Sequence, residues 1–438
     1  MRRIPVILSV IIGLTILSQQ LLSEVEFHGF LRNHSAFRMG EPNDAMLLRN
    51  RLRLNAEVWG DDVYGFASVD FLNDIIAQSE TALNLREAYL DIYGNWVDFR
   101  IGKQQVVWGK ADGYFINDIV NPLDLSLFLL QDFEDIRMAT TMLNTKLHYR
   151  SHSLEILVIP EYKPMKIDWE GNWAFYRPDS FSVEMSLVGQ PTILTLPMDY
   201  QDDSLPQKSL RNMEYGLKFN TFVLGTDLSL IYLKAREDQP KMSKSIEFSN
   251  IGLPVGVILM PIHPWFTFYG MNFARPFGMF VIRGEGGYYP SRNFDYVPEN
   301  QQEILTSTFL TNRPFVQGML GTDYQLTGDI TIAVQAIQER ILDYSESIMA
   351  DEINTLGSLL LNGDFANQTI APMWLILYNF SNDSYLSRII VDWKYSDSFT
   401  ITIGADILGG SDEVNYGQFN FGQFDGNDNL YLKLVYNF

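Results

Sequence analysis

The chain ends with the stretch NLYLKLVYNF, residues 429–438, in which apolar and more polar residues alternate. Such alternation places the two kinds of residue on opposite faces of a β-strand. One face carries Leu430, Leu432, Leu434, Tyr436 and Phe438, and the other carries Asn429, Tyr431, Lys433, Val435 and Asn437. An amphipathic last strand that ends on Phe is typical of bacterial outer-membrane β-barrels, whose strands face lipid on one side. The stretch therefore predicts such a barrel, with Tyr431 and Lys433 in the lumen.

The beginning of the chain predicts export. Arg2 and Arg3 precede an apolar run over residues 4–17, and Ser23 precedes an acidic stretch. This order is typical of a secretory signal, so we expect a signal peptide over 1–23 and the barrel over 24–438. A membrane anchor is the alternative, but the run is shorter than the ~20 residues that a spanning helix needs.

Composition argues against several function classes. The formal net charge of -21 disfavours nucleic acid as a partner, and the absence of Cys excludes disulfides and thiolate sites. The five His residues form no catalytic or metal-binding motif. Acidic pairs such as Asp202 and Asp203 could bind Ca²⁺, although solvated loops are the favoured interpretation. We therefore predict no catalytic residues, no cofactor and no metal.

Strand-like segments continue the pattern upstream of the last strand, joined alternately by short and long connections. The residues at most of the short connections are Gly, Asn, Asp or Ser, as hairpin turns require. The segments predict an all-β fold, a single transmembrane antiparallel barrel of about 18 strands, with short periplasmic turns and long outer loops. Sixteen strands are the alternative, because 353–362 could be loop or helix. The predicted strands are 25–38, 45–59, 62–73, 82–93, 96–107, 138–150, 152–160, 209–221, 224–236, 263–275, 278–290, 313–326, 329–342, 353–362, 368–380, 384–396, 398–410 and 428–438.

Basic residues recur on the predicted lumenal faces. Arg49, Arg51 and Arg53 alternate with apolar residues, and a charge facing lipid at mid-depth would cost ~2–4 kcal/mol. Two interpretations stay open. The cations could favour anionic or amphipathic solutes, or they could pair with lumenal carboxylates such as Glu57, Glu87, Asp91 and Asp98. The predicted lumen residues are Arg32, Arg49, Arg51, Arg53, Arg100, Lys146, Arg283 and Lys433.

The connection 108–137 is too apolar for a free outer loop. It mixes aromatic residues with a turn at Asn121-Pro122, and the apolar run 125–130 requires burial. We predict that this connection folds into the barrel as a constriction, although packing over the outer rim is the alternative. The predicted constriction residues are Trp108, Tyr114, Phe115, Asn121, Pro122 and Asp124.

Two stretches also carry a resemblance to a known family. The first comprises Gly102, Lys103, Gln104, Val106, Trp108 and Gly109, followed by Asn121, Pro122 and Asp124. The second comprises 395–397, 404–406, 421–424 and the last strand. Together they resemble a porin-like outer-membrane family of unknown function, which is similar to but distinct from the alginate-export porins. Lys103 stands where this family more often has Arg. The resemblance implies an outer-membrane barrel that passes solutes, and it names no substrate.

The leading functional hypothesis is an outer-membrane porin for the diffusion or selective transport of small solutes, including anionic or amphipathic ones. The alternatives are a transporter for hydrophobic, fatty-acid-like compounds, and a surface adhesin or structural barrel. The expected partners are outer-membrane lipid, the solutes, and the barrel-assembly machinery, which would recognise the strand ending at Phe438. A monomer and a trimer both remain open.

Overall fold

A computed structural model describes residues 24–76, 81–175, 177–187, 190–298, 303, 307–411 and 420–438. The predicted signal peptide, 1–23, lies outside these residues. No helix in the described part of the chain is long and apolar enough to cross a membrane.

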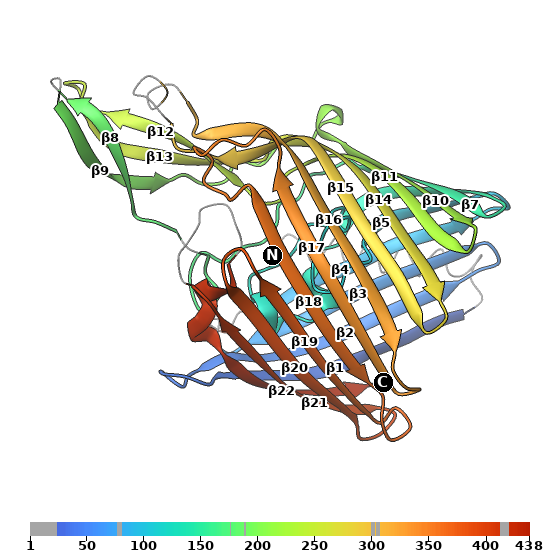
Figure 1. Ribbon diagram of the computed structural model, residues 1–438. Helices are drawn as coiled ribbons and strands as arrows, with labels where there is room; N and C mark the ends of the chain where they lie inside the picture. The colour runs from blue at the N-terminus through green and yellow to red at the C-terminus, as the bar shows by residue number, and fades with distance from the viewer. Residues whose placement is uncertain are drawn as a thin grey trace.

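Eighteen strands in the described residues form one closed barrel (Figure 1). Every pair of neighbours in the barrel is antiparallel, and the pairing of β1 with β22 closes the ring. The predicted fold and strand number are confirmed; 353–362 is a strand, and the sixteen-strand alternative is wrong. The strands are β1 (Glu24–Arg38), β2 (Ala45–Trp59), β3 (Val63–Asp74), β4 (Thr81–Tyr93), β5 (Val97–Gln104), β6 (Thr140–Tyr149), β7 (His152–Ile159), β10 (Glu214–Val223), β11 (Thr226–Arg236), β14 (Trp265–Phe277), β15 (Phe280–Asp295), β16 (Leu310–Gln325), β17 (Ile330–Ile341), β18 (Ile353–Gly363), β19 (Ile370–Asn379), β20 (Ser384–Lys394), β21 (Phe399–Gly409) and β22 (Asn429–Asn437).

The last strand has the two faces that its sequence predicts. Leu430 and Tyr436 are about half exposed on the outside, at 51% and 50%, whereas Tyr431 is 3% and Lys433 9% exposed. Apolar side chains exposed on the outer face form the surface that lipid covers. The backbone N–H of Phe438 donates to the carbonyl of Gly29 at 3.0 Å, so the end of the chain is part of the closing seam.

Two short turns lie two residues later than predicted. β10 and β11 are joined at Leu224 and Gly225, and β14 and β15 at Gly278 and Met279. Leu224, Gly225 and Gly278 have φ of 53°, 77° and 60°, as the tight turns of β-hairpins require. The predicted turn at 276–277 is therefore wrong, because Gly278 is the residue that suits the left-handed conformation.

The outer connections 161–208 and 237–262, predicted as loops, contain a second sheet. It comprises β8 (Ser180–Leu187), β9 (Gln190–Tyr200), β12 (Lys241–Phe248) and β13 (Pro254–Ile262). Strands β9 and β13 pair in parallel, and Leu196, Val257 and Leu259 pack with Phe309 in its core. Figure 1 shows this sheet projecting beyond one end of the barrel. The sheet depends on pairing between two distant connections, which local alternation does not reveal.

Candidate functional site in the barrel lumen

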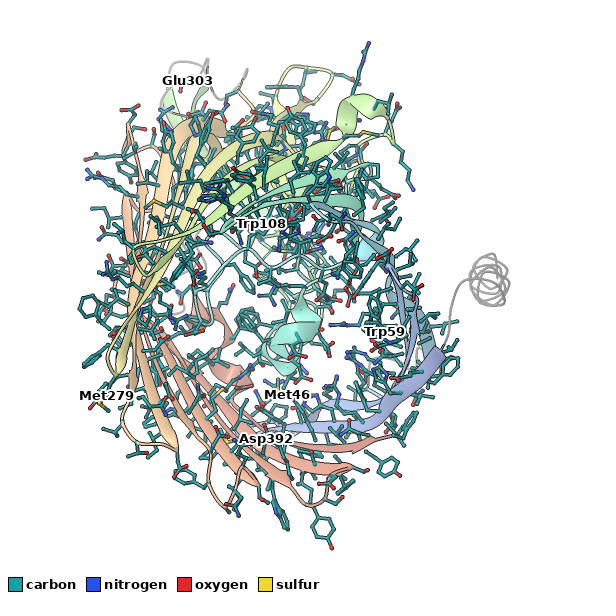
Figure 2. The ribbon with its side chains drawn as sticks, turned by 90° about the vertical axis from the view of Figure 1, so that its right-hand side faces the viewer. Met46, Trp59, Trp108, Met279, Glu303 and Asp392 are labelled. Atoms are coloured by element: carbon teal, nitrogen blue, oxygen red, sulfur yellow. The ribbon has the colours of Figure 1, made fainter. Side chains whose placement is uncertain are left out.

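Residues 105–139, here called the lumen segment, connect β5 to β6 and lie inside the ring of strands (Figure 2). The segment contains the 3-10 helix η1 (Phe128–Leu130) and the short helix α2 (Phe133–Ile136). It reaches strands on opposite walls of the barrel, as its contacts show. The connection folds inward, as the sequence predicts, and packing over the rim is wrong.

Trp108 holds the beginning of the lumen segment against one wall. The side chain is 1% exposed, and its Nε1–H donates to Glu155 Oε2 at 3.0 Å. Asn272 Nδ2 donates to the Trp108 carbonyl at 2.6 Å. A Cβ at Gly216 would lie 2.7 Å from the indole, so glycine at this position makes room for the ring. Trp108 is therefore part of the packed interior.

The next residues continue this attachment along β15 to β17. The backbone N–H of Asn117 donates to Glu285 at 3.1 Å, and the Tyr114 hydroxyl donates to Glu339 at 2.7 Å. Gln317 Nε2 donates to the carbonyl of Ile116 at 2.9 Å. These hydrogen bonds satisfy backbone and hydroxyl groups that burial would otherwise leave unpaired.

The predicted Asn121-Pro122 turn joins the two ends of the lumen segment. Asn121 Oδ1 accepts from the N–H of Val106 at 2.6 Å, and Asn121 Nδ2 donates to the carbonyl of Met138 at 3.1 Å. The carbonyl of Pro122 accepts from the N–H of Met138 at 2.8 Å. One side chain thus fixes how the segment leaves β5 and returns to β6.

Phe115 and Asp124 make the remaining predicted contacts of the segment. The ring of Phe115 stacks on Phe133 with centroids 5.2 Å apart, and the Asp124 carboxylate accepts from Ser126 Oγ at 2.6 Å. Both contacts are internal to the segment, and Asp124 in addition pairs with Lys166 of the connection after β7 at 3.3 Å.

The apolar run predicted to require burial is buried. Phe128 is 8% and Leu130 3% exposed, and both belong to a cluster that includes Leu47 of β2 and Leu408 of β21. This cluster places the second part of the segment against the wall that closes the barrel.

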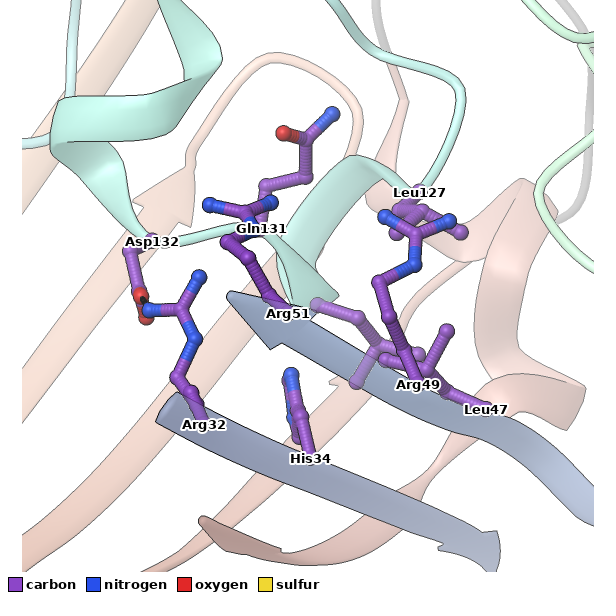
Figure 3. A pocket seen from close by; sticks show the side chains of 9 residues that line it. Arg32, His34, Leu47, Arg49, Arg51, Leu127, Gln131 and Asp132 are labelled. Atoms are coloured by element: carbon purple, nitrogen blue, oxygen red, sulfur yellow. Dashed lines mark hydrogen bonds and ion pairs between the residues drawn. The ribbon is translucent and has the colours of Figure 1, made fainter. Parts of the chain in front are cut away.

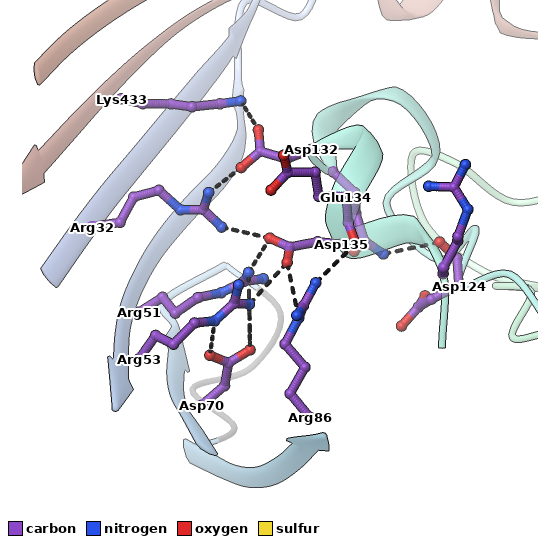
Figure 4. A network of polar contacts seen from close by, with 12 residues as sticks. Arg32, Arg51, Arg53, Asp70, Arg86, Asp124, Asp132, Glu134, Asp135 and Lys433 are labelled. Carbon is purple, nitrogen blue, oxygen red and sulfur yellow. Dashed lines mark hydrogen bonds and ion pairs between the residues drawn. The ribbon is translucent and has the colours of Figure 1, made fainter. Parts of the chain in front are cut away.

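Two carboxylates that directly follow this run pair with inward-facing arginines of β1, β2 and β4 (Figure 4). We call the inward-facing arginines of the barrel wall the arginine ladder. Asp135 meets Arg32 at 3.0 Å, Arg53 at 2.8 Å and Arg86 at 3.4 Å, and also contacts Arg51. Asp132 pairs with Arg32 and Lys433. We call this group the ion-pair cluster: Arg32, Arg51, Arg53, Arg86, Lys433, Asp132 and Asp135.

The cluster keeps both carboxylates ionised. Burial alone would raise the pKa of Asp132, but Lys433 and Arg32 outweigh burial and lower this pKa to about 2. The pKa of Asp135 is lowered below its ordinary value by Arg51, Arg53 and Arg32, again against burial. Buried ions of opposite charge are tolerated only when they are paired in this way.

The other predicted cations of the lumen are mostly paired as well. Arg49 meets Asp74 at 2.9 Å and Arg100 meets Asp91 at 2.6 Å. Arg283 lies 2.8 Å from Asp323 and also contacts Asp112, whereas Lys146 is exposed on β6. Of the two interpretations of the ladder, pairing is therefore correct for its arginines.

The partners differ from those predicted. Among the four predicted carboxylates, Asp91 and Glu87 meet arginines, whereas Glu57 and Asp98 meet His28 and His148. The structure adds Arg86 to the predicted cations, and the following acidic partners were not predicted: Asp70, Asp74, Asp112, Asp132 and Asp135. Two features of the sequence could have identified four of these residues. Asp70 and Asp74 lie on the side of β3 that faces the lumen, and Asp132 and Asp135 directly follow the apolar run.

A small cavity lies beside the ion-pair cluster (Figure 3). It is about 10 Å³ in volume and is lined by Arg32, His34, Arg49 and Arg51, among others. His34 Nε2 and Arg51 Nε are buried and have no hydrogen-bond partner among the described residues. A single water needs about 10–15 Å³, so the cavity has room for one water molecule at most.

Comparison with known proteins supports the fold. The model of a family described as "Protein of unknown function (DUF1302)" matches residues 49–356, and no curated protein matches the chain. Solved structures with the same fold include three from Pseudomonas aeruginosa. OccD3 is 10% identical, with a TM-score of 0.51 and coverage of 95% of this chain and 92% of OccD3.

The other two were solved with small molecules. OpdK, solved with vanillate, is 9% identical, with a TM-score of 0.52 and coverage of 95% and 99%. OccK2, in complex with glucuronate, is 9% identical, with a TM-score of 0.52 and coverage of 95% and 98%. The chain thus has the fold of bacterial outer-membrane porins.

Proposed function

The chain belongs to the family of proteins of unknown function DUF1302, and we propose that it is an outer-membrane channel through which small solutes diffuse. Barrels of 16–18 strands are too wide for wall side chains to fill and leave an aqueous channel. The proposal requires no catalytic residue and no cofactor.

One observation carries this proposal: the lumen segment is bound to opposite walls of the barrel. Trp108 and Asn117 attach it to the side of β7 and β14–β15, and Asp132 and Asp135 attach it to β1–β4 and β22. A segment fixed at both sides narrows the lumen to a constant cross-section and places charged groups beside the remaining path.

We further propose that the channel favours small anionic or amphipathic solutes. The ion-pair cluster brings together five cations, and their carboxylate partners are Asp70, Glu87, Asp132 and Asp135. Five cations against four carboxylates leave a positive excess beside the constriction. OpdK and OccK2, which share the fold, were solved with vanillate and glucuronate.

The proposal extends to assembly in the membrane. We propose that export uses the predicted signal over 1–23, and that the barrel-assembly machinery recognises the strand ending at Phe438. The apolar outer face, with residues such as Leu430 and Tyr436 half exposed, would be covered by lipid. A monomer and a trimer are equally compatible with this function.

Single-channel recording in planar bilayers tests the function. The refolded protein should give discrete conductance steps, with a reversal potential in a KCl gradient that shows preference for chloride. Replacing residues 109–136 with Gly-Ser-Gly should enlarge the steps severalfold, because the constriction is removed. Replacing the exposed turn 249–252 with the same tripeptide is the matched control and should leave them unchanged. Absence of steps at all voltages, with a correctly folded barrel, would overturn the proposal.

A further inference from the structure

A second cavity, here called the mouth pocket, opens beside the outer end of the lumen segment. Its walls come from the connection after β7, from β9 and from β13, and Met138 of the lumen segment belongs to them. Its volume is about 470 Å³, within the range of roughly 300–1,000 Å³ typical of small-molecule sites. The pocket is thus large enough for an organic molecule.

Two cations in the mouth pocket have no carboxylate partner in the described part of the chain. Lys163 is half-buried, and no hydrogen bond or ion pair satisfies its ammonium group. Burial lowers the pKa of Lys163, although Asp124 partly offsets this effect. Arg177 also makes no ion pair among these residues, and it is exposed. A half-buried ammonium group without a partner on the wall of a cavity favours an anionic ligand, and the exposed guanidinium adds a second positive charge to the same wall.

Flat aromatic and flexible apolar groups make up much of the remaining wall. The guanidinium of Arg177 lies 3.6 Å from the ring centroid of Tyr200 and 5.6 Å from that of Trp169. Met138, Met165 and Met242 also line the cavity. Methionine side chains adapt to irregular apolar shapes. The flat faces of the aromatic rings and of the guanidinium can pack against a flat part of a ligand.

The mouth pocket is joined directly to the lumen segment. Lys166, which lines the pocket, donates its backbone N–H to the carbonyl of Leu123 at 2.9 Å and accepts from the N–H of Leu125 at 2.8 Å. Its ammonium group meets Asp124 at 3.3 Å. A molecule in the pocket would therefore touch the structure that sets the constriction.

We propose that the mouth pocket binds an amphipathic monoanion, a carboxylate attached to a flat aromatic or alicyclic body. The carboxylate would pair with Lys163, and the flat body would lie along Arg177, Tyr200 and the methionines. Asp202 and Asp203 also line the pocket. Asp203 contacts His263 at 3.1 Å, and the two carboxylates disfavour a second negative charge on the ligand. The inference rests on the proposed channel function and names the solute class for it.

Equilibrium binding of 2-naphthoate to the full refolded protein in detergent tests the assignment. We expect saturable binding, with 2-naphthalenemethanol and acetate each on the order of tenfold weaker, because one lacks the charge and the other the flat body. K163M and R177Q should each weaken naphthoate binding about tenfold. K208Q, which changes a lysine paired with Glu161 outside the pocket, is the matched control and should bind like the unaltered protein.

The outcomes separate the two proposals. Equal binding of naphthoate and its neutral analogue, or unchanged binding by K163M and R177Q, would overturn the pocket assignment while leaving channel conductance intact. Specific binding by a protein that shows no conductance would overturn the channel and leave the pocket. Circular dichroism and heat-modified gel mobility of each variant confirm that the barrel is folded.

Discussion

The two parts of the lumen segment are held in the barrel by different kinds of contact. Trp108 and Asn117 are buried and bonded mainly through N–H groups of the segment, whereas Asp132 and Asp135 are held by several arginines and a lysine. Protonation of Glu155 or Glu285 would weaken a hydrogen bond from a neutral N–H group, whereas protonation of Asp132 or Asp135 would leave buried cations without a counter-charge, which costs more. The comparison indicates that the acidic part is the one whose release could change conductance.

The largest effect should come from D135N. This substitution leaves Arg51, which is 7% exposed, with only a 4.0 Å contact to Asp70, whereas Arg53 keeps Asp70 at 2.7 Å. Breaking a buried pair costs about 3–5 kcal/mol, so we expect α2 to leave the wall, the conductance to rise and the preference for chloride to increase. Single-channel recording measures both quantities.

D98N is the matched control for D135N. Asp98 pairs with His148 at 2.7 Å, and both side chains are partly exposed, at 29% and 39%. Exposed pairs contribute about 0–1 kcal/mol, so this variant should conduct like the unaltered protein. Equal changes in the two variants would show that the ion-pair cluster has no special role.

A smaller effect should come from pH. The pKa of Asp132 is lowered from 3.8 to about 2. The free energy with which Asp132 holds the lumen segment against the barrel wall is therefore complete above about pH 4 and is lost as the pH falls towards 2. The shift corresponds to about 2 kcal/mol. Conductance should therefore be constant from pH 7 to 4 and should rise only near pH 2.

K433Q sharpens the pH experiment. Lys433 is the leading cation that lowers the pKa of Asp132, so its loss should move the rise in conductance to higher pH. A rise between pH 5 and 7 in the unaltered protein would contradict the assignment to Asp132.

The smallest effect on the channel should come from W108F in the other part of the segment. The variant loses the Nε1–H donated to Glu155 at 3.0 Å, and the smaller ring leaves space beside Gly216; Asn144 still donates to the Glu155 carboxylate at 2.7 Å. We expect a loss of about 2 kcal/mol, seen as a lower midpoint of thermal unfolding, with ion selectivity unchanged. W96F, at a side chain 66% exposed, should have no effect. A selectivity change as large as that of D135N would mean that the two parts do not differ.

Much of the barrel was predictable because its signal is local. The alternation that places Leu430 outside and Lys433 inside needs only the period of a strand and the cost of charge in lipid. The turn between β14 and β15 lies two residues after its predicted position, because Pro276 also favours a turn and Gly278 is the residue that forms it. The outer sheet was missed because β9 and β13 pair across two connections, and no local pattern specifies such a pairing.

The sequence by itself determined the barrel, the inward face of strands such as the last one, and the burial of Phe128 and Leu130 in the apolar run. Only the tertiary structure decided that Asp132 and Asp135 neutralise arginines from β1, β2 and β4. Ion pairing depends on distance in space, and the cluster joins groups about 50 to 300 positions apart along the chain. The arginine ladder, which in sequence resembles an open basic wall, is in the folded protein the attachment of the lumen segment, because buried charges are stable only where a partner meets them.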